Sequence, residues 1–253
     1  MIYDLQKASM WKRISAFLFD GILLGIVAVL FAWLLSVIMR FDVYNDTLNA
    51  KYEQYGAEYG VSFQMSLSDY EEMTDETSRR LDEAYRALGQ DEEAAHAYRM
   101  VFELSLAISS LGIFLAYMAL EFAVPLALRN GQTLGKKIFG LALMKTDGVR
   151  VNGVTMFVRT LLGKYTLETM IPVLLIAMIY FSMIGLIGSV VLLLILLVQI
   201  VLLFSTRTRS LIHDLLANTV EVDLASQMIF DSREAMIAYK EKKRAEQAAR
   251  EPY

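Results

Sequence analysis

One stretch of the chain restricts its fold more than any other feature. Residues Asn152–Phe204 contain only three charged side chains, Arg159, Lys164 and Glu168. Apolar runs of about 18 or more residues are typical of helices that cross a membrane. Hydrophobic residues make up 56% of the 253-residue chain, whereas soluble domains contain about 45–50%. These features predict an integral membrane protein and argue against an ordinary soluble enzyme.

The apolar runs predict four spans. Leu161–Phe204 is 44 residues long, and one helix of that length would extend about 66 Å, twice the thickness of a bilayer core. We therefore expect it to fold back near Gly185 and Gly188. The first run, Ile14–Met39, is too long for the core of a signal peptide. We divide the chain into eight segments. The first four are the N-terminus with the first span (1–39), an insertion (40–99), the second span (100–128) and a loop with a hairpin (129–160). The last four are the third span (161–184), the fourth span (185–204), an interfacial segment (205–223) and a charged tail (224–253).

The distribution of charge predicts one orientation in the membrane. Residues 40–99 carry fourteen acidic and six basic side chains, and the other eighteen basic residues lie in the remaining polar segments. Basic residues in short loops stay in the cytoplasm. We therefore expect a multi-pass protein of a bacterial-type plasma membrane, with both termini in the cytoplasm. The predicted fold is an all-α four-helix transmembrane bundle with an extracytoplasmic helical insertion and a small cytoplasmic hairpin.

The insertion between the first two spans has the periodicity of amphipathic helices. A stripe of Tyr and Leu residues spaced three or four apart predicts that the first span continues outward to Gly60. Ser68 and Glu71 form a capping box for a second helix that would end at Gly89, and Asp91 would cap the helix of the second span. The insertion is either a solvated helical cap or an acidic vestibule that concentrates cations or docks a partner.

The segment after the second span has the pattern of a small hairpin. Ile138–Met144 alternates weakly, Asp147-Gly148 is a strong turn signal, and Val149–Asn152 would return as a strand. Thr219–Asp223 also alternates and is a second candidate for this sheet. The tail is mostly charged and predicts a solvated helix, whose basic cluster would either aid solubility or touch anionic lipid.

Three acidic side chains lie within the predicted spans: Asp20, Glu121 and Glu168. A charge inside a span costs about 2.5–3.5 kcal/mol on insertion scales and is by default a hypothesis of function. On the predicted topology all three lie in the cytoplasmic half of the membrane. We expect them to form one cluster with the charged residues near the same interface. Those residues are Arg13, Lys136, Lys137, Arg159, Arg207, Arg209 and Asp214.

Two of these carboxylates precede a proline by four residues, Glu121 before Pro125 and Glu168 before Pro172. Because proline lacks an N–H, the carbonyl four residues earlier loses its helical donor. Each position is either a simple kink or a place where a water, a cation or a donor side chain binds.

Small residues recur at spacings of three and four on the first two spans. Such ridges let helix backbones approach closely, so these two spans are expected to be neighbours. The ridges consist of Gly21, Gly25, Ala28 and Ala32 on the first span and Gly112, Ala116, Ala119 and Ala123 on the second.

A set of short motifs resembles the RDD family of membrane proteins, which is named for one Arg and two Asp. The Arg matches Arg13 in Trp-Lys-Arg, the first Asp matches Asp20 in Phe-Asp-Gly, and the second matches Asp214 in His-Asp-Leu-Leu-Ala. The resemblance covers residues 7–39 and 100–222, and the insertion 40–99 is much longer than the short loop usual in the family. Further matching positions are Glu121, Gly131, Thr133, Gly135, Lys136 and Arg159.

The resemblance implies transport, including cation/proton exchange. In that case Asp20 and Glu121 would bind a cation or proton, and Arg13 or Arg159 would tune their pKa values. The alternative is a non-transporting scaffold, assembly or lipid-binding protein in which the Arg/Asp cluster is a structural ion-pair lock.

A third reading, a membrane enzyme, lacks a recognisable nucleophile or metal set. The chain has no Cys and two His, and His213 beside Asp214 is only half of a catalytic pair. We expect no catalytic residues, no cofactor, no metal and no nucleic-acid partner. The expected partners are membrane lipids, a monovalent cation or proton, and further copies of the chain in a homo-oligomer.

Overall fold

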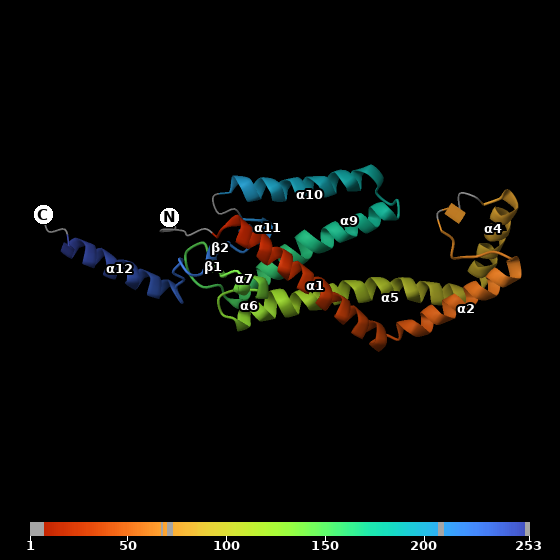
Figure 1. Cartoon of the computed structure of the whole chain (residues 1–253), viewed down its shortest axis with the longest axis horizontal. Helices are drawn as coiled ribbons and strands as arrows, with labels where there is room; N and C mark the ends of the chain where they lie inside the picture. Colours follow the sequence, from red (N-terminus) through yellow and green to blue (C-terminus); the bar gives the residue numbers. More distant parts are fainter. Residues whose placement is uncertain (1–7, 67, 70–72, 207–209, 251–253) are drawn as a thin grey trace. The chain divides into compact units, whose positions relative to one another are not determined.

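The computed structural model describes residues 8–66, 68–69, 73–206 and 210–250. The chain forms two compact units (Figure 1): unit 1 comprises Met1–Ile26 with Phe114–Tyr253, and unit 2 comprises Val27–Ile113. The described residues contain four helical stretches long and apolar enough to cross a membrane. The prediction of an all-α membrane protein with four spans is confirmed. The four stretches are Met10–Ile38, Glu92–Ala127, Gly153–Tyr180 and Gly185–Ser205.

The second and third stretches begin before the apolar runs that predicted them, because polar caps start each helix early. Asp91 Oδ1 accepts hydrogen bonds from the N–H groups of Glu93 and Ala94, as predicted. Asn152 Oδ1 accepts one from the N–H of Thr155. The second stretch contains α5 (Glu92–Ala116), η1 (Tyr117–Ala123) and α6 (Val124–Ala127), and the third contains α8 (Gly153–Phe157), η2 (Val158–Met170) and α9 (Ile171–Tyr180).

Two helical segments, η1 and η2, have the wide turns of a π-helix. Each ends two residues before a proline: η1 ends at Ala123 before Pro125, and η2 ends at Met170 before Pro172. A proline in a helix removes one backbone donor, and π-type turns are uncommon and occur often at functional sites. The proline positions that predicted a local break therefore coincide with a widening of both helices.

The predicted reversal between the third and fourth spans is present. Helix α9 ends at Tyr180 and α10 (Gly185–Ser205) begins at Gly185, so the chain turns within residues 181–184. Gly185 has a φ of 47°, a left-handed conformation that glycine adopts without a steric penalty. Helices α9 and α10 then run back along each other (Figure 1).

A two-stranded antiparallel sheet in unit 1 joins segments that are far apart in the sequence. Strand β1 (Leu141–Lys145) pairs with β2 (Thr219–Asp223), the second candidate partner of the sequence analysis. The local hairpin is limited to a bridge between Met144 and Arg150. It is short because the returning segment soon reaches Asn152, which caps α8. One face of the sheet is a buried apolar cluster of Ala142, Met144, Val220 and Val222.

Three further helices complete unit 1. Helix α7 (Leu134–Ile138) and helix α11 (Ile212–Leu216) are single turns that carry motif residues. Helix α12 (Arg233–Arg250) is the predicted charged tail helix. Its start is held near the turn after β1, where Arg233 Nη2 lies 3.5 Å from Asp147 Oδ2.

In unit 2 the first span does not continue outward as one helix, contrary to the prediction. Helix α1 (Met10–Ile38) ends, and α2 (Phe41–Tyr59) begins after Arg40, which has a left-handed φ of 55°. The Tyr and Leu stripe is thus carried by a separate helix, which ends before Gly60 as expected.

Helix α4 (Asp75–Gln90) is capped by Thr74, whose side chain accepts a hydrogen bond from the N–H of Thr77. The predicted capping box from Ser68 includes Glu71, which lies outside the described residues. The expected approach of the first two spans is seen where both belong to unit 2. A Cβ on Gly112 of α5 would lie 3.1 Å from the Ala28 carbonyl oxygen of α1.

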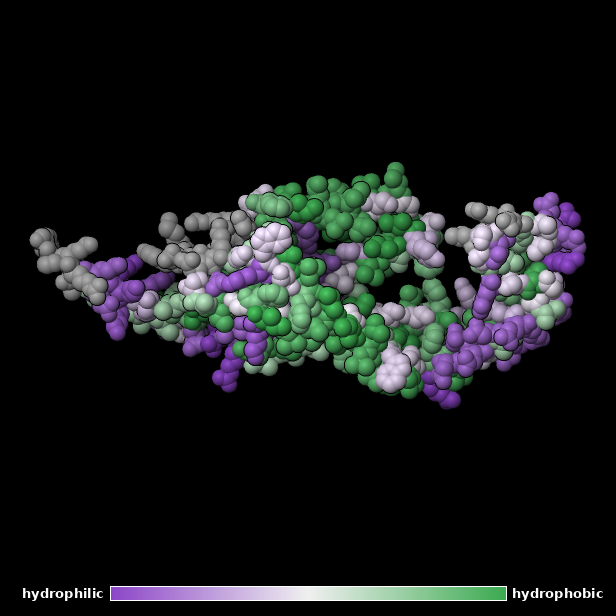
Figure 2. Space-filling model, viewed as in Figure 1, coloured by the Kyte–Doolittle hydropathy of each residue, from purple (hydrophilic) through white to green (hydrophobic). Residues whose placement is uncertain are grey.

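The surfaces of the two units differ in polarity. Hydrophobic side chains cover the visible face of α9 and α10, whereas hydrophilic side chains cover much of α2 (Figure 2). On α10, Leu186 and Ile187 are 80% and 76% exposed. Large exposed apolar surfaces are rare in soluble monomers and mark contact with a membrane or a partner, in agreement with the spans.

Candidate functional site

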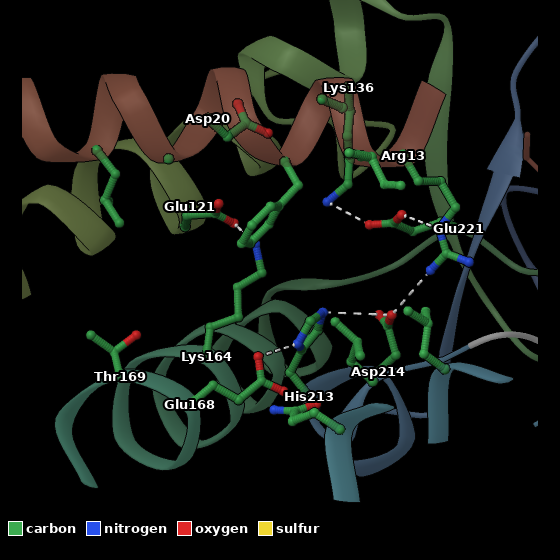
Figure 3. Close-up of a pocket in the computed structure, with 18 of the residues that line it drawn as sticks. Arg13, Asp20, Glu121, Lys136, Lys164, Glu168, Thr169, His213, Asp214 and Glu221 are labelled. Atoms are coloured by element: carbon green, nitrogen blue, oxygen red, sulfur yellow. Dashed lines mark hydrogen bonds and ion pairs between the residues drawn. The ribbon is translucent and has the colours of Figure 1, made fainter. Parts of the chain in front are cut away.

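A cavity of about 440 Å³ lies within unit 1, and its wall combines apolar and charged side chains (Figure 3). Its apolar part comes mainly from α1, α10 and the segment before α11. Its charged part brings together residues from α1, η1, η2, α7, α11 and β2. The charged side chains of the wall are Arg13, Asp20, Glu121, Lys136, Lys164, Glu168, Asp214 and Glu221.

A buried ion pair joins Arg159 to Asp214, which is part of the cavity wall. Arg159 Nε is 2.9 Å from Asp214 Oδ1, and each side chain is only 1% exposed. Thr219 Oγ1 also donates to Asp214 Oδ1, at 2.9 Å. Burial raises the pKa of Asp214, but the adjacent Arg159 guanidinium outweighs it and holds this pKa below its usual range. Asp214 is therefore an anion in this arrangement.

One oxygen of the Asp214 carboxylate has no hydrogen-bond donor among the described residues. Among the described residues, Asp214 Oδ2 is buried and accepts no hydrogen bond. Arg13 Nη2 lies 4.0 Å from this oxygen, and His213 Nε2 lies 3.5 Å away. A buried acceptor without a partner costs about 1–3 kcal/mol, so this oxygen is a place where a donor or a cation would be stabilised.

Glu221 of β2 binds three cationic side chains. It accepts from Arg13 Nε at 2.8 Å and lies 2.9 Å from Lys136 Nζ and 3.4 Å from Arg159 Nη2. Burial raises the pKa of Glu221, but Lys136, Arg13 and Arg159 together hold it well below its usual range. Burial also lowers the pKa of Lys136, more than Glu221 raises it.

Glu121 and Lys164 form a second pair, between η1 and η2. Lys164 Nζ lies 2.6 Å from Glu121 Oε2, and both side chains are largely buried. The backbone carbonyl of Glu121, which Pro125 leaves without a helical donor, accepts a hydrogen bond from Thr160 Oγ1 at 2.8 Å. A donor side chain thus occupies the position that the proline spacing predicted.

Glu168 of η2 binds His213 of α11 twice. Glu168 Oε1 accepts from the His213 backbone N–H at 3.0 Å, and Oε2 lies 2.7 Å from the imidazole Nδ1. The other ring nitrogen, Nε2, lies 3.0 Å from Arg159 Nη2. An arginine can only donate, so Nε2 is the acceptor and the hydrogen is on Nδ1. This network assigns His213 as a neutral imidazole that donates to Glu168.

Asp20 binds a loop rather than an arginine. Its carboxylate accepts from Thr133 Oγ1 at 2.5 Å and from the Gly135 N–H at 2.7 Å, and Figure 3 shows it directed toward that loop. Thr133 also caps α7 by accepting from the Lys136 N–H. Gly135 is required for this approach, because a Cβ there would lie 2.5 Å from the Ala16 carbonyl oxygen.

The structure thus brings most of the expected residues close together, but they form separate groups that each have their own binding partners. Arg13 pairs with Glu221 and Asp214, whereas Asp20 binds Thr133 and Gly135, and Lys137 is exposed. Arg207 and Arg209 lie outside the described residues. Gly131, the first glycine of the loop motif, has a φ of 61° and allows the chain to turn into α7.

Three charged or titratable members of the site were not singled out from the sequence. Lys164 lies five residues after Arg159 and four before Glu168, so helical spacing was an available signal. Glu221 alternates with buried Val220 and Val222, which indicated a polar face on β2. His213 was considered only as half of a catalytic pair. In the described part of the chain, no three His, Asp or Glu side chains are grouped so that they could hold a metal ion.

The sequence matches the model of one protein family. A model described as the RDD family matches residues 7–218 of the chain. No curated protein and no solved structure matches it. The matched segment includes both Asp20 and Asp214 and also the whole of the insertion.

Proposed function

This chain belongs to the RDD family of membrane proteins, and from that premise we propose that it is a small secondary transporter that exchanges a monovalent cation for protons. The proton would be taken up in the charged cavity of unit 1, and the role would be transport rather than catalysis. The family membership supports a multi-pass membrane protein, and the cavity supports the ion-binding part of the proposal.

The observation that carries the proposal is the unequal charge around the cavity. Among the described residues, five carboxylates and four cationic side chains meet there, with His213 neutral, so the cluster has one excess negative charge. The carboxylates are Asp20, Glu121, Glu168, Asp214 and Glu221, and the cations are Arg13, Lys136, Arg159 and Lys164.

An unbalanced negative charge at low dielectric favours uptake of a positive one. Two of the carboxylates have no cationic partner within the described residues: Asp20 binds Thr133 and Gly135, and Glu168 binds neutral His213. Protonation of a group in this cavity would remove the imbalance, and charged groups within membrane segments are typical of proton relays.

The proposal includes an orientation. The basic segments would lie in the cytoplasm with both termini, in a bacterial-type plasma membrane, and the acidic insertion would lie outside. Four spans are few for alternating access, so the working form would be a homo-oligomer surrounded by membrane lipids.

A specific observation favours a second candidate function. Each of the four cations around the cavity already has a carboxylate within 2.9 Å, and the Arg159–Asp214 pair is almost fully buried. A cluster paired so completely would also serve as a structural lock in a non-transporting scaffold, assembly or lipid-binding protein.

Proton flux in proteoliposomes tests the two candidates. The purified chain is reconstituted with a pH-sensitive dye inside, and gradients of Na⁺, K⁺ or Li⁺ are imposed. We expect a cation gradient to drive proton movement in the parent chain and Glu168→Gln to abolish it. Glu103→Gln, the same chemical change at an exposed position of α5 outside the cavity, is the matched control and is expected to keep the flux.

The outcomes separate the two candidates. If the parent moves protons with none of these cations, transport of this kind is refuted. If the parent moves protons and Glu168→Gln moves them at the same rate, the cavity is not the proton site. If flux is absent in the parent, and Arg159→Met destabilises the protein while replacement of both Arg159 and Asp214 by apolar residues recovers stability, the structural lock is supported.

A further inference from the structure

We propose that His213 is the group in the cavity that binds the proton, and that protonation moves its Nε2 hydrogen bond from Arg159 to the free Oδ2 of Asp214. This inference deepens the proposed function and rests on it for the meaning of the bound proton. The hydrogen-bond geometry around the imidazole carries it.

The starting state is fixed by two neighbours of the imidazole. Glu168 Oε2 lies 2.7 Å from Nδ1, and Arg159 Nη2 lies 3.0 Å from Nε2. Since Arg159 has only donors to offer, Nε2 has its lone pair directed at the guanidinium and carries no hydrogen. The imidazole is therefore held in one neutral tautomer by a carboxylate on one side and an arginine on the other.

When Nε2 of His213 is protonated, its hydrogen bond with Arg159 is lost, because the new Nε2–H and the Arg159 N–H are both donors. The new N–H needs an acceptor, and Asp214 Oδ2 is 3.5 Å away, buried and without a hydrogen bond among the described residues. Arg159 keeps other partners when it releases His213, because its Nε remains on Asp214 Oδ1 and its Nη2 lies 3.4 Å from Glu221 Oε1. The proton adds to Nε2, Nδ1 keeps its own, and no covalent bond breaks.

The charge of the cluster favours this step. With His213 neutral, the described residues around the cavity carry one excess negative charge, and an imidazolium at this position would balance it. Burial lowers the pKa of His213, while Asp214 and Glu168 raise it and Arg159 lowers it further. The net shift is downward, so the described arrangement is the unprotonated state at neutral pH and acid favours the second state.

Every element packed on His213 contributes to this balance. From η2 come Glu168 and Arg159, and from α11 itself comes Asp214. Glu221 of β2 reaches the imidazole through Arg159, with Lys136 and Arg13 bound to Glu221 in turn. From α10, the uncharged Gln199 binds the backbone N–H next to His213 and the Glu168 side chain.

The packing keeps the imidazole in place during such a change. Gly163 of η2 lies directly against His213, and a Cβ on Gly163 would come within 2.6 Å of the His213 Cα. The backbone N–H of His213 is also bound to Glu168. Protonation would therefore alter hydrogen bonds without displacing α11 from η2.

Nitrogen-15 NMR of the histidine rings in the full chain, embedded in lipid nanodiscs, tests this inference directly. The chain has only two histidines, so His96→Gln leaves the signals of His213 alone. At about pH 8 we expect the shifts of a neutral ring with the hydrogen on Nδ1. On acidification we expect both nitrogens to become protonated, with a midpoint below the ordinary value of about 6.5.

A variant separates the proposed exchange from simple titration. Asp214→Asn removes the charged acceptor for Nε2–H and is expected to move the midpoint down by about one pH unit or more. Thr219→Val removes the hydrogen bonds from Thr219 to Asp214 Oδ1 and to the Asp214 carbonyl but keeps the carboxylate, and is expected to move the midpoint much less. If Asp214→Asn does not fold, the tautomer and midpoint of the His96→Gln chain decide the question.

Several results would overturn the inference: a ring with its hydrogen on Nε2 at about pH 8, an imidazolium already present there, a midpoint at or above 6.5, or an unchanged midpoint in a folded Asp214→Asn variant. The test is independent of transport. Absence of proton flux with the expected NMR behaviour would refute the transport function and leave the proton site standing, and the reverse pattern would refute only the role of His213.

Discussion

The two units contain lysine–carboxylate pairs of nearly equal length in very different surroundings. In unit 2, Lys51 Nζ lies 2.8 Å from both Asp91 Oδ2 and Glu93 Oε2, and Glu93 is 67% exposed. In unit 1, Lys136 Nζ lies 2.9 Å from Glu221 Oε1, and the lysine side chain is 5% exposed. The partners and distances match, but the first group stays in contact with solvent through Glu93, whereas Lys136 and Glu221 are 5% and 11% exposed.

The pKa values show what that difference does. The pKa of Lys51 is raised by its hydrogen bonds to Asp91 and Glu93, and that of Asp91 is lowered to about 2 by Lys51. The pKa of Lys136 is lowered, because burial outweighs the attraction of Glu221. An ion pair near solvent stabilises both charges, whereas a buried pair is costly and depends on the complete network. Substitutions in the two units should therefore differ strongly in effect.

The largest effect is expected from Arg159→Met. This change leaves Asp214 buried without its cation, and breaking a buried pair typically costs about 3–5 kcal/mol. Thermal unfolding in detergent, followed by circular dichroism, measures the loss. The double variant Arg159→Met with Asp214→Leu removes both charges and is expected to recover part of the stability. A single variant that melts like the parent would contradict the comparison between the units.

A smaller effect is expected from Gly135→Ala. The new Cβ would lie 2.5 Å from the Ala16 carbonyl oxygen and 2.9 Å from Asp20 Cγ, so α7 must move away from α1 and strain its bond to Asp20. Overpacking of this kind typically costs about 1–3 kcal/mol. Gly25→Ala is the matched control, because its Cβ would meet nothing within 4 Å. Equal melting temperatures for the two variants would show that the contact is not tight.

The pH dependence of stability comes next. Because the folded-state pKa of His213 is lowered, the unfolded chain binds more protons as the pH falls below about 6.5, so the free energy of unfolding declines there by up to about 1.4 kcal/mol per pH unit. Asp214 and Glu221 also have lowered pKa values, and their contribution is lost at still lower pH. His213→Gln should flatten the decline just below pH 6.5. A parent chain equally stable across this range would argue against the buried neutral imidazole.

The smallest effect is expected in unit 2, from Lys51→Met. Asp91 keeps its hydrogen bonds to the N–H groups that start α5, and Tyr55 still donates to its other oxygen. The released carboxylate can also reach water. We expect only a slight change in melting temperature, measured as for Arg159→Met. A loss comparable to that of Arg159→Met would remove the contrast between exposed and buried pairs.

Much of the fold followed from hydrophobic length alone. Runs such as Ile14–Met39 and the reversal near Gly185 depend on the thickness of a bilayer and on glycine, both of which can be judged from one sequence. The break at Arg40 could not be predicted in the same way. The Tyr stripe of α2 begins four residues after Arg40, at Tyr44, and a single left-handed residue carries no pattern of its own.

Most residues of the site could be predicted from the sequence, but the partner of each residue could not. The transport hypothesis assigns Arg13 or Arg159 as the charged neighbour of Asp20. The actual partners come from elsewhere in the chain. The loop around Thr133 and Gly135 supplies Asp20 with two hydrogen-bond donors, and β2 places Glu221 beside Arg13. Those partners come from segments distant in the sequence, and the spacing of residues along one helix does not predict which distant segment packs against it.

The position of Glu221 has a practical consequence. The family match ends at residue 218, so β2 and this carboxylate lie entirely beyond it. A protein shortened to that boundary would keep every matched residue, yet β1 would have no strand beside it and Arg13 and Lys136 would lose their nearest anion. Expression boundaries for this protein and its relatives should therefore be chosen from the folded unit, not from the end of sequence similarity.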